Sequence, residues 1–233
     1  PRHGVGHALL PSEINYRANI WALKSVGVCR LLSVSAVGSL TEEIRPGDLA
    51  IPNQYSDFTK GRRASTFFGD GVVAHISSAN PSCSSLSQEI VRLSKAQDLL
   101  VHHKATYACV EGPRLGTRSE SYFLRMTGSH LVGMTNVPEA FLAREAQLCY
   151  CTIAVVTDFD CWKDDPSEHV TVDKVIALYQ ENIKRVCTLL GSVVSEGSFN
   201  NSCDCRKALD GAVMTHEDSL SQERREFLSF LRN

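Results

Sequence analysis

The stretch Cys149-Tyr-Cys-Thr-Ile-Ala-Val-Val-Thr157 is the most strand-like run in the chain, because apolar and β-branched residues fill it without a charge. It leads directly into the polar turn Asp158-Phe-Asp-Cys-Trp-Lys163. Polar residues that follow a buried strand lie where open α/β sheets bind their ligands. The stretch therefore predicts a central strand and, at its end, the start of a binding site.

Strand-like and helix-like segments alternate along the rest of the chain, which predicts a layered α/β fold. We expect strands at residues 31–36, 49–51, 105–110 and 131–134, and helices at 12–26, 84–100, 117–126, 138–146 and 171–190. Ser12 is the expected N-cap of the first helix. Residues 54–71 have no clean period and are expected to form a loop, and residues 197–202 a linker to a short helical tail.

The composition favours a small soluble enzyme. The 233 residues, 43% of them hydrophobic and 21% charged, suffice for one large α/β domain with a packed core. The net charge of -2 offers no positive footprint for nucleic acid. The longest strongly apolar run without Asp, Glu, Lys or Arg, residues 146–157, is too short to cross a bilayer, and no basic, apolar leader opens the chain. We therefore expect a cytoplasmic protein, or one also found in the nucleus in a eukaryote, without nucleic-acid or membrane partners.

The nine cysteines mostly lie in apolar stretches, which is typical of reduced, buried thiols. Cys149-Tyr-Cys151 and Cys203-Asp-Cys205 raise a zinc hypothesis together with His102-His103. The first pair lies on one face of a buried strand, and no Cys-x-x-Cys is present, so we expect no metal site. The pair in the tail is expected to be exposed and inert, with a redox-active or disulfide-forming pair as the alternative.

Polar residues stand at or just after the carboxyl ends of several predicted strands: Ser35, Glu111, Thr135 and the pair Thr157-Asp158. A polar residue often does no more than end a strand, but four such ends in one chain favour a small-molecule pocket. Asp158 and Asp160 are the most specific signal, because a carboxyl group near apolar walls and a second carboxylate has a raised pKa and can stay protonated. The alternative is an ordinary Asp-x-Asp turn.

Arg2 and His3, with His7 nearby, combine a cation and imidazoles in a way that suits an anion such as phosphate. An exposed basic terminus has the same pattern, so the spacing alone does not decide between the two.

An ordered set of motifs covers residues 1 to about 190. It comprises Pro1-Arg-His-Gly4 with His7, Asn15-Tyr-Arg-Ala-Asn-Ile-Trp-Ala-Leu-Lys24, Ser35-Ala-Val-Gly-Ser-Leu40, Pro46-Gly-Asp48, Glu111-Gly-Pro-Arg114, Glu120-Ser121, Gly133-Met-Thr135, Val137-Pro-Glu139 and Thr157-Asp-Phe-Asp-Cys-Trp-Lys163. Together they resemble the S-methyl-5′-thioadenosine phosphorylases, in the trimeric branch of the purine nucleoside phosphorylases.

The resemblance implies a single domain over residues 1–233 with a three-layer α/β/α sandwich around a mixed central sheet, assembled as a homotrimer. Members of the family begin with a strand and a glycine-rich phosphate turn, which this sequence is expected to lack, with weaker phosphate binding as the result unless the sequence was cut from a longer protein. Residues 197–233 form a tail whose Cys203-Asp-Cys205 pair is similar to that of archaeal-type members.

The resemblance also implies a reaction in purine and methionine salvage: phosphorolysis of S-methyl-5′-thioadenosine to adenine and 5-methylthioribose 1-phosphate, with phosphate as co-substrate and no metal or organic cofactor. Asp158 would donate a proton to N7 of the base, and Asp160 would accept from its 6-amino group. Phosphate would be bound by Arg2, His3, Ser35, the backbone of Ala36, and Thr135.

Further contacts to the nucleoside are implied in the same way. Met134 would lie against the ribose, Thr157 would contribute to binding the substrate, and the methylthio group would lie in an apolar slot. That slot would be formed by Val172, Val175, Ile176 and His7, with His75 reaching in from a neighbouring subunit.

The sequence departs from the family pattern after Arg114, where Leu115 and Gly116 replace an aromatic residue and a hydroxyl. Leu115 offers less stacking area on the base and Gly116 one hydrogen bond fewer, so we expect a change in base affinity or selectivity. Glu111 is expected to brace the backbone rather than take part in catalysis. Two alternatives stay open: a purine nucleoside phosphorylase acting on adenosine or 6-oxopurine nucleosides, and a non-catalytic relative.

Overall fold

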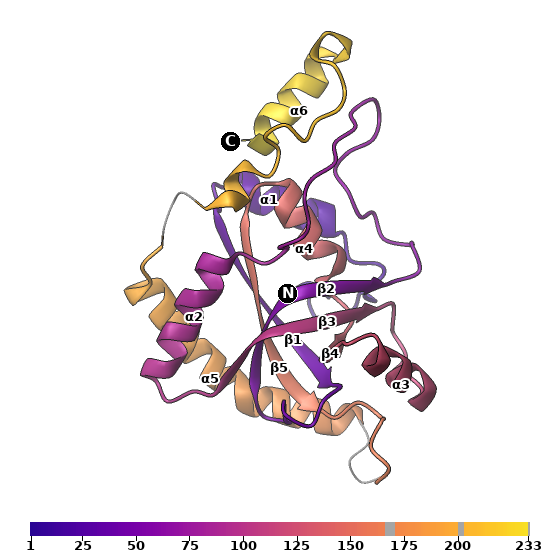
Figure 1. The fold of residues 1–233 in the computed structure, drawn as a ribbon, viewed down its shortest axis with the longest axis vertical. Coiled ribbons are helices and arrows are strands. Elements are labelled where there is room, and N and C mark those ends of the chain that lie inside the picture. The colour runs from indigo at the N-terminus through magenta and orange to yellow at the C-terminus, as the bar shows by residue number, and fades with distance from the viewer. Residues whose placement is uncertain (166–170, 200–202, 233) are drawn as a thin grey trace.

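The computed structural model describes residues 1–165, 171–199 and 203–232, apart from the side chains of Val172 and Lys174 (Figure 1). Its five strands are β1 (Arg30–Ser39), β2 (Leu49–Phe58), β3 (Val101–Val110), β4 (Leu131–Gly133) and β5 (Cys149–Asp158). They pair in the order β1-β4-β3-β2-β5, and the sheet curls until β5 also pairs with β1, so the strands form a closed barrel.

Strand β5 is the central element, as the sequence predicts. It runs parallel to β1 along its length and antiparallel to β2 near Val155, and all ten of its residues are buried. β3 runs parallel to both β2 and β4, and β1 runs antiparallel to β4, so the sheet is mixed. This pairing brings the ends of strands from distant parts of the sequence to one place.

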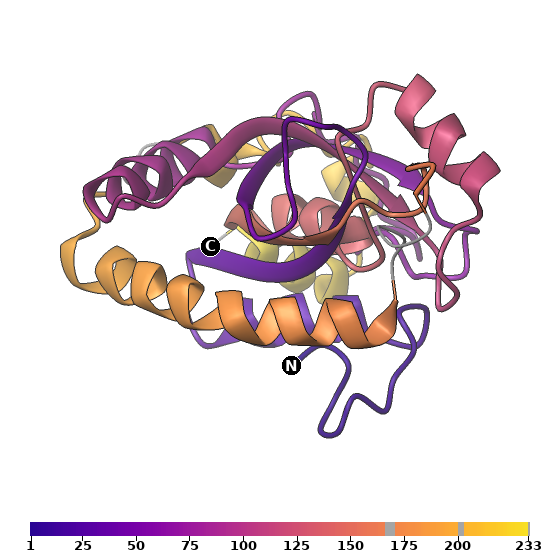
Figure 2. The ribbon, with the colours of Figure 1, turned by 90° about the horizontal axis from the view of Figure 1, so that it is seen from below.

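Helices pack on two sides of the curled sheet, which agrees with the expected three layers (Figure 2). α2 (Ser84–Ala96) and α5 (Val172–Glu196) pack on one face, and α1 (Tyr16–Ser25) and α4 (Asn136–Glu145) on the other. α6 (Gln222–Arg232) packs against the α1 and α4 layer, and α3 (Arg118–Met126) lies beside the β3 and β4 end of the sheet. Two short 3-10 turns, η2 (Asp204–Lys207) and η3 (Glu217–Ser219), precede α6.

Two expectations about the elements are wrong. The first helix begins after Asn15, whose side chain accepts a hydrogen bond from the Ala18 N–H, while Ser12 lies in a preceding turn. The segment after residue 51 continues as strand to Phe58, although it was expected to become a loop at Gln54. The reason is tertiary: β3 supplies parallel hydrogen-bond partners for a segment whose own polar residues give no clear signal.

No described helix has the length and apolar character that a membrane span requires.

Candidate active site

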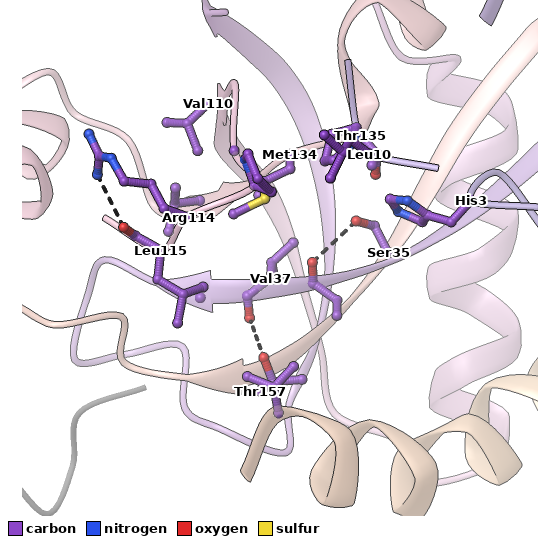
Figure 3. A pocket seen from close by; sticks show the side chains of 18 of the residues that line it. His3, Leu10, Ser35, Val37, Val110, Arg114, Leu115, Met134, Thr135 and Thr157 are labelled. Carbon is purple, nitrogen blue, oxygen red and sulfur yellow. Dashed lines mark hydrogen bonds between the residues drawn. The ribbon is translucent and has the colours of Figure 1, made fainter. Parts of the chain in front are cut away.

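A pocket of about 1360 Å³ lies where the middle of β1 meets the segments that follow β3, β4 and β5. Most of the residues singled out from the sequence line it: Arg2, His3, His7, Ser35, Ala36, Leu115, Gly116, Met134, Thr135, Thr157, Asp158, Asp160, Val175 and Ile176. Figure 3 shows His3, Ser35 and Thr135 gathered on one side, Leu115 on the other, and Met134 between them. The pocket therefore has a polar side suited to an anion and a separate side suited to a base.

Asp158 is the last residue of β5 and is buried. Burial raises the pKa of its carboxyl group to about 6, even though it accepts hydrogen bonds from the Thr157 hydroxyl and the Asp160 N–H, both at 2.7 Å. The Thr157 hydroxyl also lies 3.2 Å from the Val37 carbonyl oxygen (Figure 3). A carboxyl group with this pKa can carry a proton into a reaction near neutral pH.

Asp160 lies beside Asp158 in a backbone conformation with φ of 53°, and burial also raises the pKa of its carboxyl group. The two acids pack against β1 at Gly38, where an added Cβ would lie 2.9 Å from Oδ1 of Asp158. A side chain at position 38 would therefore displace the acid, so glycine is required for this close approach. Asp158 is thus fixed by the end of β5, and Asp160 by the turn that follows this strand, where its N–H donates to Asp158.

Arg2 is held in place by Glu139 of α4. Its guanidinium donates to both carboxylate oxygens of Glu139, at 2.5 and 2.8 Å, to the Val34 carbonyl oxygen at 2.9 Å and to the Ser33 hydroxyl. The Tyr150 hydroxyl also donates to Glu139 at 2.8 Å. Sequence analysis missed this role of Glu139, although the residue stands in the quoted Val137-Pro-Glu motif.

His3 and His7 stack with their ring centroids 4.0 Å apart, and Nδ1 of His3 lies 2.8 Å from the Leu9 carbonyl oxygen. Burial lowers the pKa of His3, and the nearby His7 and Arg2 lower it further, against the opposing effect of the Leu9 carbonyl. An anion bound beside His3 would favour its charged form and so reverse this shift.

Thr135 and Met134 follow β4 directly. Thr135 is the N-cap residue of α4, but its hydroxyl makes no capping hydrogen bond. Met134 faces the glycine turn after β3, because a Cβ added at Gly112 would lie 2.5 Å from its sulfur. The end of β4 thus offers the pocket one hydroxyl group and one polarisable apolar surface.

A buried ion pair supports this part of the pocket. The Arg63 guanidinium donates to the Glu111 carboxylate at 3.1 Å and to the carbonyl oxygens of Met134 and Val137 at 2.7 and 2.6 Å. The Lys60 N–H donates to the other oxygen of Glu111 at 2.6 Å. Glu111 thus braces the backbone in the structure. Arg63 was missed because it lies in a segment without periodicity and only the tertiary fold buries it.

The residues implied to contact the methylthio group have different outcomes. Val175 and Ile176 of α5 line the pocket, together with Tyr179, which the sequence did not single out. The side chain of Val172 lies outside the described residues. His75 does not line this pocket: it lines a smaller one, together with Arg144 and some of the residues that follow Cys203, and a contribution from a neighbouring subunit stays a prediction.

Gly116 is close enough to Asp160 for a side chain to matter, because an added Cβ would lie 3.9 Å from both carboxylate oxygens, in ordinary contact. We expect Gly116→Ser to lower KM for the nucleoside by roughly 2- to 10-fold, the effect of one hydrogen bond. Steady-state kinetics would measure this. Gly191→Ser, at a helix glycine with open space around it, is the matched control. An unchanged KM in both variants would show that position 116 does not face the base.

Comparisons with known proteins agree with one another. The family model described as Phosphorylase superfamily matches residues 1–194. The S-methyl-5′-thioadenosine phosphorylase of Geobacter sulfurreducens is 46% identical over 231 residues, which are 99% of this chain and 80% of that protein. A methylthioadenosine phosphorylase from an antarctic soil metagenomic library is similar with a TM-score of 0.87 and 43% identity over 99% of this chain and 81% of that one. The enzyme from Schistosoma mansoni in complex with adenine gives a TM-score of 0.85 and 37% identity over 94% and 82%.

Proposed function

The chain belongs to the phosphorylase superfamily, and on that premise we propose that it catalyses the phosphorolysis of S-methyl-5′-thioadenosine. A phosphate oxygen forms a bond to C1′ of the sugar while the bond from C1′ to N9 breaks. The electron pair of that bond goes to the purine, which takes up a proton at N7. The products are adenine and 5-methylthioribose 1-phosphate, and the balance requires no cofactor beyond phosphate as co-substrate.

The buried Asp158 carboxyl group carries this proposal. A purine leaves easily only when its developing charge is neutralised, and a protonated carboxyl group beside N7 does so by donating its proton. Asp160, whose backbone N–H donates to Asp158, would accept from the exocyclic amino group of adenine. A carboxylate at this position repels the carbonyl oxygen of a 6-oxopurine, so Asp160 favours 6-aminopurines.

The opposite side of the pocket supports phosphate binding. Arg2 supplies a permanent charge, His3 a ring that can become charged, and Ser35 and Thr135 two hydroxyl groups. Because the Arg2 guanidinium already bonds to both oxygens of Glu139, its direction is fixed before phosphate arrives. Met134 lies between this side of the pocket and the side of Leu115 (Figure 3). The ribose of the substrate would lie against Met134, between the phosphate and the base.

The uncharged methylthio group fits the apolar wall that α5 contributes through Val175 and Ile176. Ile176 is 49% exposed in the single chain, and Val5, which also lines the pocket, is 94% exposed. These apolar side chains support the further proposal that a second subunit closes the pocket in a homotrimer. Light scattering after gel filtration should then give three times the chain mass of 25.6 kDa, and a monomer that turns over at full rate would contradict the proposal.

The decisive test is incubation with S-methyl-5′-thioadenosine and phosphate, with adenosine and inosine compared under the same conditions. We expect adenine release to depend on phosphate and inosine to react slowest. A faster reaction with inosine would favour the alternative of a 6-oxopurine nucleoside phosphorylase and overturn the role given to Asp160. Adenine binding without product from any nucleoside would indicate the non-catalytic relative.

The pH dependence of kcat/KM should report Asp158. Its protonated form is the active one, and burial raises its pKa to about 6, so activity should decline as the pH rises through and above that value. Well above this pKa, each further pH unit should lower kcat/KM roughly tenfold, because the protonated fraction of Asp158 falls tenfold. This decline would be measured as kcat/KM for the nucleoside at saturating phosphate, from pH 5 to about 9. The same decline in an Asp158→Asn variant would assign the titration to another group.

A further inference from the structure

Four cysteines from distant parts of the sequence meet at the amino-terminal end of β5. Cys83 is the N-cap residue of α2, Cys149 is the first residue of β5, and Cys203 and Cys205 lie at the start of the tail, in and before η2. Their sulfur atoms all lie within 4.8 Å of one another. Figure 1 shows the tail returning to the body of the protein next to the start of α2.

The four sulfur atoms lie close enough together to bind one thiophilic metal ion. In a tetrahedral zinc site each Zn–S bond is about 2.3 Å, which places the sulfur atoms about 3.8 Å apart. All the separations are at most 4.8 Å, and that between Cys149 and Cys203 is 3.0 Å, so small side-chain adjustments bring the sulfur atoms to this distance. Cys83, Cys149 and Cys205 are buried and Cys203 is half-buried, so the cluster is shielded from water.

The surroundings compensate the charge that such a site would carry. Four thiolates and one divalent ion leave two negative charges, which a buried site must balance. Cys83 lies at the N-terminus of a 13-residue helix, whose dipole favours a negative charge. The Arg144 guanidinium donates a weak hydrogen bond to the Cys205 sulfur at 3.9 Å and so brings a positive charge to the cluster.

We propose that Cys83, Cys149, Cys203 and Cys205 bind one structural Zn²⁺ ion per chain. The ion displaces the thiol protons, which are released to solvent as four thiolates form around it. Because all four positions are filled by protein, no site is open for water or substrate, and the role is structural rather than catalytic.

The proposal replaces the sequence-based expectation of no metal. Sequence reasoning paired Cys149 with Cys151 and considered His102-His103, whereas Cys151 contacts Ser87 and His102 bonds to Asp48. Cys83 gave no signal, because its partners are far away in the sequence. Spacing alone cannot reveal ligands that only the fold brings together.

The consequence for the protein is attachment of the tail. After η2 the chain contributes Leu209, Leu231, Phe227 and Phe230 to the core formed with α1 and α4. The ion would fix the start of this segment to α2 and β5, and so stabilise packing that begins only a few residues later. Zinc should therefore raise the unfolding temperature of the whole chain.

Cobalt and zinc titration of the full chain tests the site. The protein is reduced and treated with a chelator, and Co²⁺ is then added as the probe. We expect one Co²⁺ per chain with the intense thiolate-to-cobalt absorption of a tetrahedral sulfur site, displaced by one equivalent of Zn²⁺. The Cys203→Ser/Cys205→Ser variant should bind at least about 100-fold more weakly, whereas Cys29→Ser/Cys187→Ser, at two cysteines outside the cluster, should bind normally.

Two results would overturn the proposal. One is a reduced wild-type chain that binds neither ion in stoichiometric amount, with these cysteines found instead as disulfides in protein isolated without reductant. The other is Co²⁺ binding that lacks the thiolate absorption, or that persists unchanged in the Cys203→Ser/Cys205→Ser variant. The wild-type titration alone decides the matter if that variant fails to fold.

Discussion

Asp158→Asn is expected to lower kcat by about 100- to 10 000-fold, the range that loss of a positioned general acid produces. Asparagine has nearly the same shape and can still accept from the Asp160 N–H, but it cannot transfer a proton to N7 of the departing purine. Rapid-quench or steady-state measurement of adenine release at saturating phosphate and nucleoside gives kcat directly. The loss should appear in kcat more than in KM, because proton transfer occurs only as the bond to the sugar breaks.

The same substitution should leave the fold intact. Burial disfavours the charged form of Asp158, as its raised pKa shows, so a neutral amide relieves this cost. Asp164→Asn is the control, since its carboxylate belongs to the same part of the chain after β5 but is 94% exposed in its pair with Arg118. Unchanged kcat in Asp158→Asn would exclude the proposed proton donor, and a collapsed unfolding temperature would require the variant to be repeated as Asp158→Ser.

The sequence predicts the fold well wherever one element carries its own signal. β5 is apolar throughout and is found where expected, and the polar residues after it do line the pocket. β2 shows the limit: its second half is polar, and its strand conformation depends on pairing with β3. Local propensity cannot report a hydrogen-bond partner that lies far away in the sequence.

The residues of the candidate site differ in the same way: some have a local sequence signal, and others depend on partners far away in the sequence. Asp158 and Asp160 could be identified because two acids after a buried strand form a local pattern. Arg63 and Glu139 could not, since each acts through a partner distant in the sequence. They are positioning residues, one holding the turn around Glu111 and Met134 and the other holding Arg2. Charged residues of this kind look like solvated surface until the fold shows them buried.

Arg63→Met is expected to lower the free energy of unfolding by about 3–5 kcal/mol, the cost of removing one partner of a buried ion pair. The exposed fractions of the Arg63 and Glu111 side chains are 2% and 9%, so the remaining carboxylate would stay buried without its countercharge. Burial acts to raise the pKa of Glu111, but the Lys60 N–H and Arg63 together hold it below its usual value. Thermal unfolding followed by circular dichroism should show a decrease of about 10 °C for a chain of this size.

The double variant Arg63→Met/Glu111→Gln separates the two contributions to this loss. If the unpaired charge dominates, replacing the carboxylate by a neutral amide should restore a large part of the stability. The carbonyl oxygens of Met134 and Val137 lack their donor in the single and in the double variant, so KM for the nucleoside should be raised in both. Equal stability of wild type and Arg63→Met would mean that the pair is not buried in solution. Full recovery of both stability and KM in the double variant would show that Arg63 acts on Glu111 alone and does not position Met134.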